Sequence, residues 1–207
     1  MTGLFITFEG GDGSGKSTQS ALLAQWLEGL GREVVTTREP GGTELGVEIR
    51  HLVQHRRGHV APRAEALLYA ADRAHHVATL VRPALERGAV VVQDRYLDSS
   101  VAYQGAGREL SGVRELSLWA TDGLLPDVTF LLDLDPATSR ARLGASERVY
   151  DRLEEEGGDF PARVRAEYLA LAAAEPERFV VLDATLPPGD LAAAIQSRLA
   201  SLLFQED

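Results

Sequence analysis

The residue types best suited to phosphate chemistry are concentrated near the start of the chain, in a glycine-rich stretch that contains a lysine. Its pattern is Gly10-x-x-x-x-Gly15-Lys16-Ser17. The glycines allow successive backbone N–H groups to point into one concavity, which phosphate oxygens can fill. The Lys16 ammonium would reach the β- and γ-phosphates of a nucleotide, and the Ser17 hydroxyl would hold Mg²⁺. The spacing therefore predicts a nucleoside triphosphate site.

The segments on either side of this stretch have the order that a P-loop requires. Residues Leu4–Phe8 form an apolar run typical of a buried strand. After the loop, apolar residues recur at helical spacing as far as Gly31. A glycine-rich turn without function is the alternative for the pattern alone, and this context disfavours it. Lys16 is also the only lysine among 21 basic residues, which indicates that an ammonium group is needed at this position.

The composition limits the class of protein. A length of 207 residues, 44% hydrophobic and 25% charged, suits one globular α/β domain. The formal net charge of −10 disfavours a protein that binds duplex nucleic acid. No apolar run is long enough to cross a bilayer and no leader-type segment precedes the first strand, so we expect a cytoplasmic protein. The absence of cysteine excludes disulfides, thiolate zinc sites and cysteine nucleophiles.

Strand and helix patterns alternate along the chain, which predicts one three-layer domain with a mainly parallel sheet and helices on both faces. The expected strands are residues 4–8, 33–37, 89–93, 127–134 and 179–183. Beyond the helix that follows the glycine-rich loop, the expected helices are residues 44–54, about 62–87, at least 113–120, a helix opened by Pro136, 162–173 and 191–203. A charged, glycine-containing stretch without apolar periodicity, residues 144–159, interrupts this alternation.

A P-loop does not identify the group that receives the phosphate, and three classes of protein compete. The guanine-reading motif Asn-Lys-x-Asp cannot occur, since the chain has no asparagine and its lysine is in the P-loop, so a GTPase switch is disfavoured. An ATPase motor or partitioning protein usually needs more length and more partner surface. A kinase for a small acceptor needs arginines at strand ends and a mobile arginine-bearing segment. The chain offers both.

Two pairs of residues could serve an acceptor. Asp94 and Arg95 directly follow the third expected strand, at the sheet edge where α/β folds bind ligands. Asp94 could contact Mg²⁺ directly or through water, and a structural ion pair is the alternative for the two. Tyr69 and Arg73 are four residues apart on one helix face. They could stack on a base and hydrogen-bond it, and a core tyrosine beside a surface salt bridge is the alternative.

The third candidate feature is the charged stretch at residues 144–159 and the residues just before it. Arg142, Arg148 and Arg152 lie there among acidic residues. Such a run is usually a solvated surface. The alternative is a mobile lid that closes over the triphosphate and supplies positive charge to the transferring phosphoryl group.

Four segments together carry a family resemblance: FEGGDGSGKST from Phe8, TREPGGT from Thr37, ADRAHH from Ala71 and DRYLDSSVAYQGAGR from Asp94. With these motifs the chain resembles the bacterial thymidylate kinases over essentially its whole length. The resemblance implies the P-loop nucleoside monophosphate kinase fold, with a five-stranded parallel sheet. It also implies transfer of the γ-phosphoryl group of ATP to dTMP with Mg²⁺, giving dTDP and ADP for dTTP synthesis, and a homodimer packed through helices.

The resemblance also implies roles for particular residues. The ATP-binding residues would be Gly10, Gly11, Asp12, Gly13, Ser14, Gly15, Lys16, Ser17, Thr18 and Arg142, with Arg142 near adenine. The dTMP-binding residues would be Asp12, Arg38, Pro40, Tyr69, Arg73, Arg95, Ser99, Ser100, Tyr103 and Gln104. The catalytic residues would be Lys16, Arg95, Arg152, Arg148 and Asp12, and the metal contacts Ser17 and Asp94.

Within that set, Tyr69 would stack on thymine, Arg73 would contact the edge of the base and Tyr103 would crowd the 2′ position of the sugar. Arg95 would hold the acceptor phosphate, and Asp12 would meet the 3′-hydroxyl or the metal region. Pro40 matches a proline that is often cis in the family.

The chain departs from the family pattern at two places. The stacking position is commonly phenylalanine, and Tyr69 adds a hydroxyl. Some members carry a catalytic arginine inside the P-loop, which residues 12–14 lack, so the resemblance assigns that role to the lid, with Arg152 first and Arg148 second. A kinase for another nucleoside monophosphate or for a deoxynucleoside remains the alternative activity, and a nucleotide-binding switch the alternative class.

Overall fold

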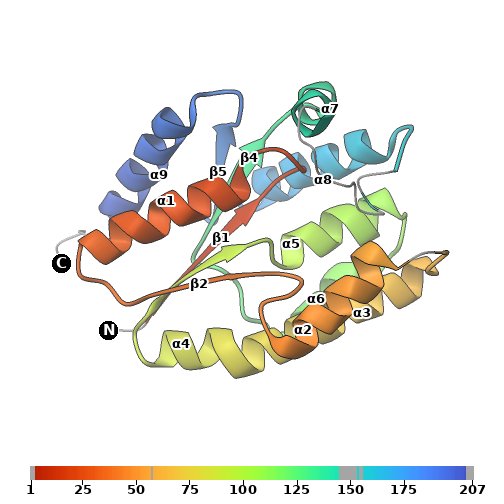
Figure 1. The fold of residues 1–207 in the computed structure, drawn as a ribbon, viewed down its shortest axis with the longest axis horizontal. Coiled ribbons are helices and arrows are strands. Elements are labelled where there is room, and N and C mark those ends of the chain that lie inside the picture. Colours follow the sequence, from red (N-terminus) through yellow and green to blue (C-terminus); the bar gives the residue numbers. More distant parts are fainter. Residues whose placement is uncertain (1–2, 57, 145–152, 154–155, 204–207) are drawn as a thin grey trace.

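The computed structural model describes residues 3–56, 58–144, 153 and 156–203, with side chains as far as residue 200 (Figure 1). Strands and helices alternate along these ranges and form three layers, as the sequence predicts. Within the described ranges, no helix has both the length and the apolar character needed to cross a bilayer.

The sheet contains five strands, all parallel, in the order β2-β3-β1-β4-β5. The strands are β1 (Leu4–Glu9), β2 (Val34–Arg38), β3 (Val90–Asp94), β4 (Val128–Asp133) and β5 (Phe179–Asp183). These bounds confirm the five predicted strands to within one residue at each end. Their register brings Phe8 level with both Asp94 and Phe130, so that the loops after β1, β3 and β4 leave the sheet side by side.

Helical segments cover both faces of the sheet (Figure 1). The α-helices are α1 (Lys16–Gly29), α2 (Glu44–Arg50), α3 (Pro62–His76), α4 (Arg82–Glu86), α5 (Leu97–Ser100), α6 (Val113–Ala120), α7 (Pro136–Gly144), α8 (Phe160–Ala174) and α9 (Pro188–Leu203). Three π-helical segments continue α2, α3 and α5: η1 (His51–His55), η2 (Val77–Val81) and η3 (Val101–Gly107).

The strands supply two separate cores because successive side chains point to opposite faces. Phe5, Val91 and Leu131 belong to the core beneath α3, η3 and α8. Ile6 and Phe8 belong to the core beneath α1 and α9 on the opposite face. The all-apolar runs of the central strands therefore reflect burial on both sides, as expected for a parallel sheet.

The helical regions differ from the prediction in their geometry. The segments expected as single helices at residues 44–54 and 62–87 both contain a wider π-helical stretch. Apolar spacing over so few residues does not separate a π-helix from an α-helix, so the sequence could not reveal this.

In η3, a β-carbon at Gly107 would lie 2.6 Å from the Phe160 ring. Glycine is therefore needed where η3 meets α8.

A buried ion pair holds α5 against the sheet. Asp98 accepts two hydrogen bonds from Arg178, at 2.7 and 2.9 Å, and its side chain is fully buried. Arg178 also donates to the Thr129 hydroxyl of β4 at 2.9 Å. A bidentate pair of this kind fixes geometry as well as charge. It anchors the short helix that follows Arg95 at the carboxyl edge of the sheet.

Candidate active site

The glycine-rich loop lies between β1 and α1, as a P-loop requires. Gly10, Gly13 and Gly15 have positive φ angles of 131°, 75° and 94°. A β-carbon at Gly10 would overlap the carbonyl oxygen of Leu132, so only glycine fits there. The loop ends at the N-terminus of α1, where unpaired N–H groups and the helix dipole favour an anion.

Lys16 is held inside this loop. Its Nζ donates to the carbonyl oxygens of Gly10 at 3.1 Å and Gly11 at 2.8 Å, and the residue is 7% exposed. Burial, with the neighbouring charge of Arg95, lowers the pKa of Lys16 to about 8. The carboxylates of Asp12, Asp94 and Glu9 oppose this lowering only in part, and a phosphate bound in the loop would strengthen the charged form of Lys16.

Ser17 and Asp94 come together as predicted for a metal site. The Ser17 hydroxyl donates to Asp94 Oδ2 at 2.6 Å, and Asp94 Oδ1 is buried with no hydrogen-bond partner among the described residues. One carboxylate and one hydroxyl are too few to enclose a cation, and the described residues contain no cluster of three or more acidic or histidine ligands. Mg²⁺ fits this arrangement, since it retains water and takes its other ligands from phosphates.

Arg95 follows β3 and points into the space beside the P-loop. Its φ of 68° is unusual for a residue with a side chain. One end of the guanidinium donates to the Gly10 carbonyl and to Ser99 Oγ, both at 3.1 Å. The other end forms an ion pair with Asp12. Arg95 is therefore held beside the P-loop by backbone, hydroxyl and carboxylate oxygens at once.

Asp12 is the matching group on the P-loop. It accepts from Arg95 and, at 3.0 Å, from the Tyr103 hydroxyl. Burial alone would raise the pKa of Asp12, but the charges of Arg95 and Lys16 outweigh it and hold this pKa below its ordinary value. Burial raises the pKa of Tyr103 well above its usual range, so the phenol stays protonated and donates.

A second cavity lies beside Arg95, and Lys16 is not among the residues that line it. Every predicted dTMP contact except Arg38 lines it: Asp12, Pro40, Tyr69, Arg73, Arg95, Ser99, Ser100, Tyr103 and Gln104. Glu39, Gln54, Tyr96 and Leu153 complete the lining. The Glu39–Pro40 peptide bond is cis, as expected from the resemblance. This acceptor cavity is formed by side chains from six separate segments of the chain, which the fold brings together.

Arg73 is the most constrained side chain in the acceptor cavity. It is 1% exposed and donates from Nε to Glu39 at 2.8 Å. Its other donors reach Ser117 Oγ at 3.1 Å, the Tyr96 carbonyl at 3.2 Å and Ser100 Oγ at 3.0 Å. These contacts to described residues use four of the five N–H groups of the guanidinium. The remaining one, on Nη1, is available to a ligand.

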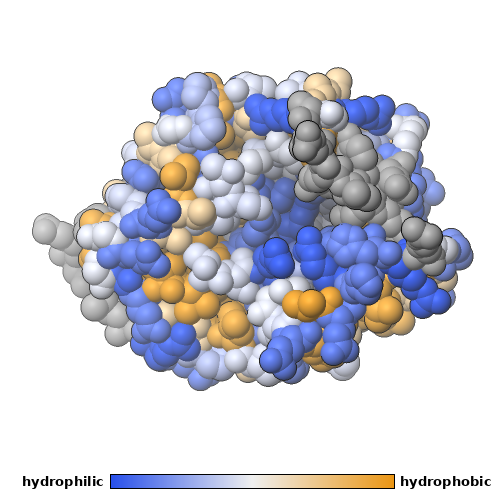
Figure 2. Space-filling model, viewed as in Figure 1, coloured by the Kyte–Doolittle hydropathy of each residue, from blue (hydrophilic) through white to orange (hydrophobic). Residues whose placement is uncertain are grey.

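A wider groove runs beside the P-loop and joins the acceptor cavity. It is lined by Lys16, Ser17, Thr18, Arg38, Asp94 and Arg142, together with Arg50. Asp12, Glu39, Gln54 and Arg95 line both spaces. In Figure 2 this region is a hydrophilic hollow in the centre of the face shown. Arg142, which is predicted to lie near adenine, donates to the carbonyls of Gly13 and Ala184.

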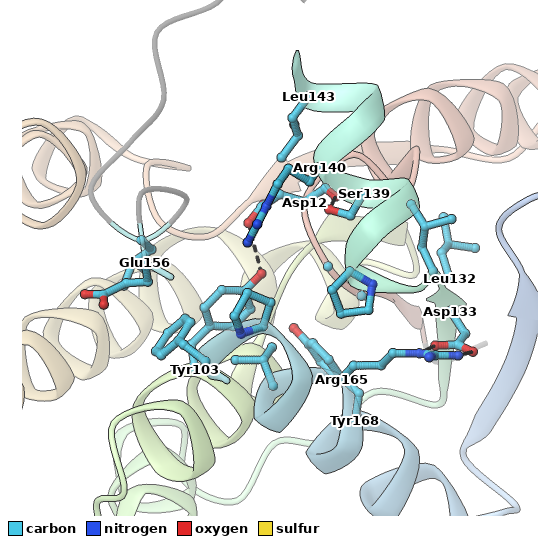
Figure 3. Close-up of a pocket in the computed structure, with 18 of the residues that line it drawn as sticks. Asp12, Tyr103, Leu132, Asp133, Ser139, Arg140, Leu143, Glu156, Arg165 and Tyr168 are labelled. Atoms are coloured by element: carbon cyan, nitrogen blue, oxygen red, sulfur yellow. Dashed lines mark hydrogen bonds and ion pairs between the residues drawn. The ribbon is translucent and has the colours of Figure 1, made fainter. Parts of the chain in front are cut away.

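A third cavity lies behind Asp12, between the P-loop, α7 and α8 (Figure 3). Ser139 closes one side by donating to the Asp12 carbonyl at 2.6 Å. Arg165 and Asp133 form a bidentate pair at its edge, with both hydrogen bonds 2.8 Å long. Asp12, Tyr103 and Leu153 line both this space and the acceptor cavity.

Comparison with known proteins agrees with this geometry. A sequence model of the family described as thymidylate kinase matches residues 8–195. The thymidylate kinase of Leifsonia xyli is 73% identical over 199 residues, covering 95% of this chain and 94% of that protein. That of Clavibacter michiganensis is 70% identical over 205 residues, covering 98% and 97%. The chain belongs to the thymidylate kinase family.

A solved structure supports the same assignment for the fold. The thymidylate kinase from Ehrlichia chaffeensis is 31% identical in sequence, and its structure matches with a TM-score of 0.77. The match covers 96% of this chain and 99% of the Ehrlichia chain. The predicted fold class is confirmed by this likeness and by the parallel sheet. Arg148 and Arg152, the predicted lid arginines of this thymidylate kinase family member, lie outside the described residues.

Buried acidic residues are the part of the site that sequence reasoning missed. Glu9, Glu39 and Glu65 are each at most 3% exposed and each holds a residue of the acceptor cavity. Gln54 and Arg50 were also missed, although both line the groove. The P-loop motif gave a signal for Glu9 by its position just before Gly10. The other residues lie on helices or in turns where a polar residue is ordinarily exposed.

Glu9 connects the P-loop strand to the turn that carries Arg95. Its Oε1 accepts from the backbone N–H of Tyr96 at 2.8 Å and of Ser99 at 3.3 Å. Its Oε2 accepts from the hydroxyls of Ser99 and Tyr168. Burial, followed by the nearby charge of Asp98, raises the pKa of Glu9 to about 7.

This pKa predicts how stability depends on pH. Between pH 4.5 and about 7 the unfolded chain has lost the Glu9 proton while the folded chain retains it, so stability falls as pH rises. The effect is about 3 kcal/mol in total. We expect the free energy of unfolding of the wild type, minus that of Glu9→Gln, to fall by this amount over the interval in urea titrations. The exposed Gln25→Ala variant, which changes no ionisable group, should show a constant difference. A constant difference for Glu9→Gln would contradict the assignment.

Proposed function

We propose that this chain transfers the γ-phosphoryl group of ATP to dTMP, giving dTDP and ADP as a step in dTTP synthesis. The observation that carries the proposal is the position of Arg95 and Asp12, which line both the P-loop groove and the acceptor cavity. A triphosphate bound in the groove and a phosphate bound in the acceptor cavity would therefore both contact Arg95. Membership of the thymidylate kinase family supports thymidylate as the acceptor.

The chemistry needs alignment and charge neutralisation more than proton transfer. The acceptor is an ionised phosphate oxygen, so no general base has to activate it. Lys16 would bind the β- and γ-phosphates, and Arg95 would hold the acceptor phosphate in line with them. Asp12 keeps Arg95 in that position. Mg²⁺, held by Ser17 and by Asp94 directly or through water, would neutralise negative charge on the triphosphate.

The same cavity has the groups that a thymine nucleotide requires. The remaining N–H of Arg73 can donate to a base carbonyl, and the Tyr69 ring lies beside it in the lining. Tyr103 is fixed by its hydrogen bond to Asp12, so its ring is a rigid wall near the sugar. We infer that this wall excludes a 2′-hydroxyl, as the resemblance implies.

Comparison of acceptors tests this function directly. ADP release from ATP and Mg²⁺ would be measured with dTMP, dUMP, thymidine or no acceptor. We expect strong stimulation by dTMP, little by thymidine, and loss of turnover with EDTA in place of Mg²⁺. Equal, slow ADP release with every addition would contradict a kinase and favour a nucleotide-binding switch, whereas stimulation by thymidine alone would indicate a deoxynucleoside kinase.

We further propose one domain, residues 1–207, in which residues 144–159 act as a lid that supplies Arg152, with Arg148 as the second choice. Arg142 already reaches the P-loop carbonyl of Gly13, so the chain leaves α7 beside the phosphates. Within the segment, Leu153 lines the acceptor cavity.

The lid proposal predicts a catalytic defect without a binding defect. We expect Arg152→Ala to lower kcat by at least about 100-fold, because a positive charge on the transferring group is lost. The Kd for dTMP should change by less than about threefold, measured by calorimetry. Arg87→Ala, which removes an exposed arginine that is paired with Glu33, is the matched control. Near-normal turnover of Arg152→Ala would refute the assignment.

A homodimer and a cytoplasmic location complete the proposal. Exposed apolar side chains lie on three neighbouring helices: Leu45 and Val47 on α2, Leu67 on α3 and Trp119 on α6. A second copy would cover this surface, whereas a monomer leaves it in water. The location is inferred from the substrates, since dTMP and ATP are cytoplasmic metabolites.

The dimer is tested by sedimentation of the purified chain. We expect twice the mass of one chain at micromolar concentration, and dissociation on Leu67→Glu, because a buried charge at the interface is unfavourable. Arg87→Ala again serves as the control on the surface. A monomer at all concentrations would contradict the proposal.

A further inference from the structure

The amide of Gln104 lies where it can read the edge of a pyrimidine. Gln104 is in η3, lines the acceptor cavity and is 1% exposed. An amide group has an oxygen that accepts hydrogen bonds and a nitrogen that donates two. Which of these two ends faces the cavity decides which base edge can pair with it. The orientation of this one amide is therefore a specificity determinant.

Glu65 fixes that orientation. Gln104 Nε2 donates to Glu65 Oε1 at 2.8 Å, across 39 positions in sequence. Glu65 lies on α3 and is fully buried. It contacts the Gln104 amide but does not itself line the acceptor cavity. A carboxylate accepts hydrogen bonds and donates none, so only the NH₂ end of Gln104 can face it. The Oε1 end is turned away from Glu65.

Arg108 places a positive charge beside Glu65. The guanidinium approaches both carboxylate oxygens at 3.5 Å and also pairs with Glu156. It lies 5.2 Å from the centre of the Phe160 ring, which holds it in place. Because arginine remains charged at all physiological pH values, the carboxylate beside it has a permanent counter-charge.

The chemistry of the bases gives this arrangement a consequence. Thymine and uracil carry an N3–H donor, whereas N3 of cytosine is an acceptor. An amide oxygen that faces the cavity can accept a hydrogen bond from N3–H of thymine or uracil. It repels N3 of cytosine, because both atoms are acceptors. We propose that Glu65 is a positioning residue that makes the acceptor cavity selective for pyrimidines with an N3–H group, through the orientation it imposes on Gln104. This inference rests on the proposed function, in which the cavity binds a pyrimidine nucleotide.

The size of the effect follows from the cost of an unpaired buried group. A site built to accept a hydrogen bond rejects a ligand that lacks the donor, because its own acceptor is left without a partner. Arg73 contributes in the same direction, since its remaining N–H suits a base carbonyl and not an amino group. Loss of the Gln104 orientation should therefore weaken the discrimination without abolishing it.

Glu65→Gln is the decisive variant. Arg108 would attract the carbonyl of the new amide, which then presents its NH₂ group to Gln104 and turns that side chain around. The Kd and kcat/KM values for dTMP and dCMP would be compared with those of the wild type. We expect the preference for dTMP over dCMP to fall at least tenfold, with dTMP binding weaker and dCMP binding stronger.

Glu156→Gln is the matched control, because it removes the other carboxylate partner of Arg108 and does not contact Gln104. We expect its dTMP-to-dCMP ratio to equal that of the wild type. A purely structural role for Glu65 would weaken both nucleotides by the same factor, and an unchanged ratio in Glu65→Gln would overturn the proposal. If the wild type does not use dTMP at all, the proposed function fails instead, and the two failures are thus distinguishable.

A second measurement on the wild type does not depend on how the variant folds. In protein labelled with ¹⁵N at glutamine, the side-chain NH₂ signal of Gln104 would be assigned by its absence in Gln104→Glu. One of its protons should exchange with solvent at least tenfold more slowly than those of Gln25, with or without dTMP. Exchange as fast as that of Gln25 would show that Glu65 does not hold the amide, and would overturn the proposal.

Discussion

A buried carboxylate at the end of β1 fixes the geometry between the two halves of the site. Glu9 accepts two backbone N–H groups from the turn after β3, including that of Tyr96. Without it, the buried N–H of Tyr96 would lose this partner, whereas that of Ser99 also donates to the Tyr96 carbonyl. The Arg95 N–H also pairs with the Phe8 carbonyl at 2.9 Å, so the turn is attached to β1 by backbone and side chain together. The distance from the P-loop to Arg95 is therefore set by the pairing of two central strands.

This attachment explains how a phosphate site and an acceptor site can be aligned without a dedicated hinge. The P-loop follows β1 and Arg95 follows β3, and these strands are neighbours in parallel register. Both loops leave at the carboxyl edge, where the chain order changes direction and α/β folds bind their ligands. The unusual φ of Arg95 turns its side chain back toward Gly10 and Asp12. Backbone strain at that residue is offset by five oxygen contacts to its guanidinium.

Features that depend on local sequence could be predicted. Each strand is an apolar run bounded by turn residues, and the P-loop combines a fixed spacing with a strand and a helix on either side. Because parallel strands share one carboxyl edge, Asp94 and Arg95 could be placed near Lys16 from the order of elements alone. The contact between Ser17 and Asp94 follows from the same rule, across 77 positions in sequence.

Features that depend on which buried polar group meets which could not be predicted. Glu65 reads as an ordinary exposed helix residue, because its partners Gln104 and Arg108 are 39 and 43 positions away. Glu39 follows a strand in a turn where a carboxylate is normally solvated, and it is buried because Arg73 and His76 both bind it. Burial of a charge is a property of the assembled fold, and the periodicity of one segment carries no information about it.

The acceptor cavity repeats one construction on three different elements. Glu9 on β1 accepts from Ser99, and Ser99 in turn contacts Arg95. Glu39, which follows β2, binds Arg73. Glu65 on α3 binds Gln104. In each case a buried carboxylate accepts hydrogen bonds from a group that lines the cavity and so uses some of that group's donors. The donors and acceptors that remain face the ligand.

This construction also accounts for an anionic protein that binds an anionic substrate. The net charge of −10 belongs to the whole chain, while the acidic groups that line the cavity, Asp12 and Glu39, are paired with its arginines. A carboxylate in that position reduces the attraction between a guanidinium and a phosphate, but it holds the guanidinium still. Fixed orientation is worth more than added charge here, because phosphoryl transfer depends on the alignment of three groups and a free arginine could bind the phosphate in many geometries. The buried acids therefore lower the net positive charge of the site, and they hold its arginines in a single arrangement.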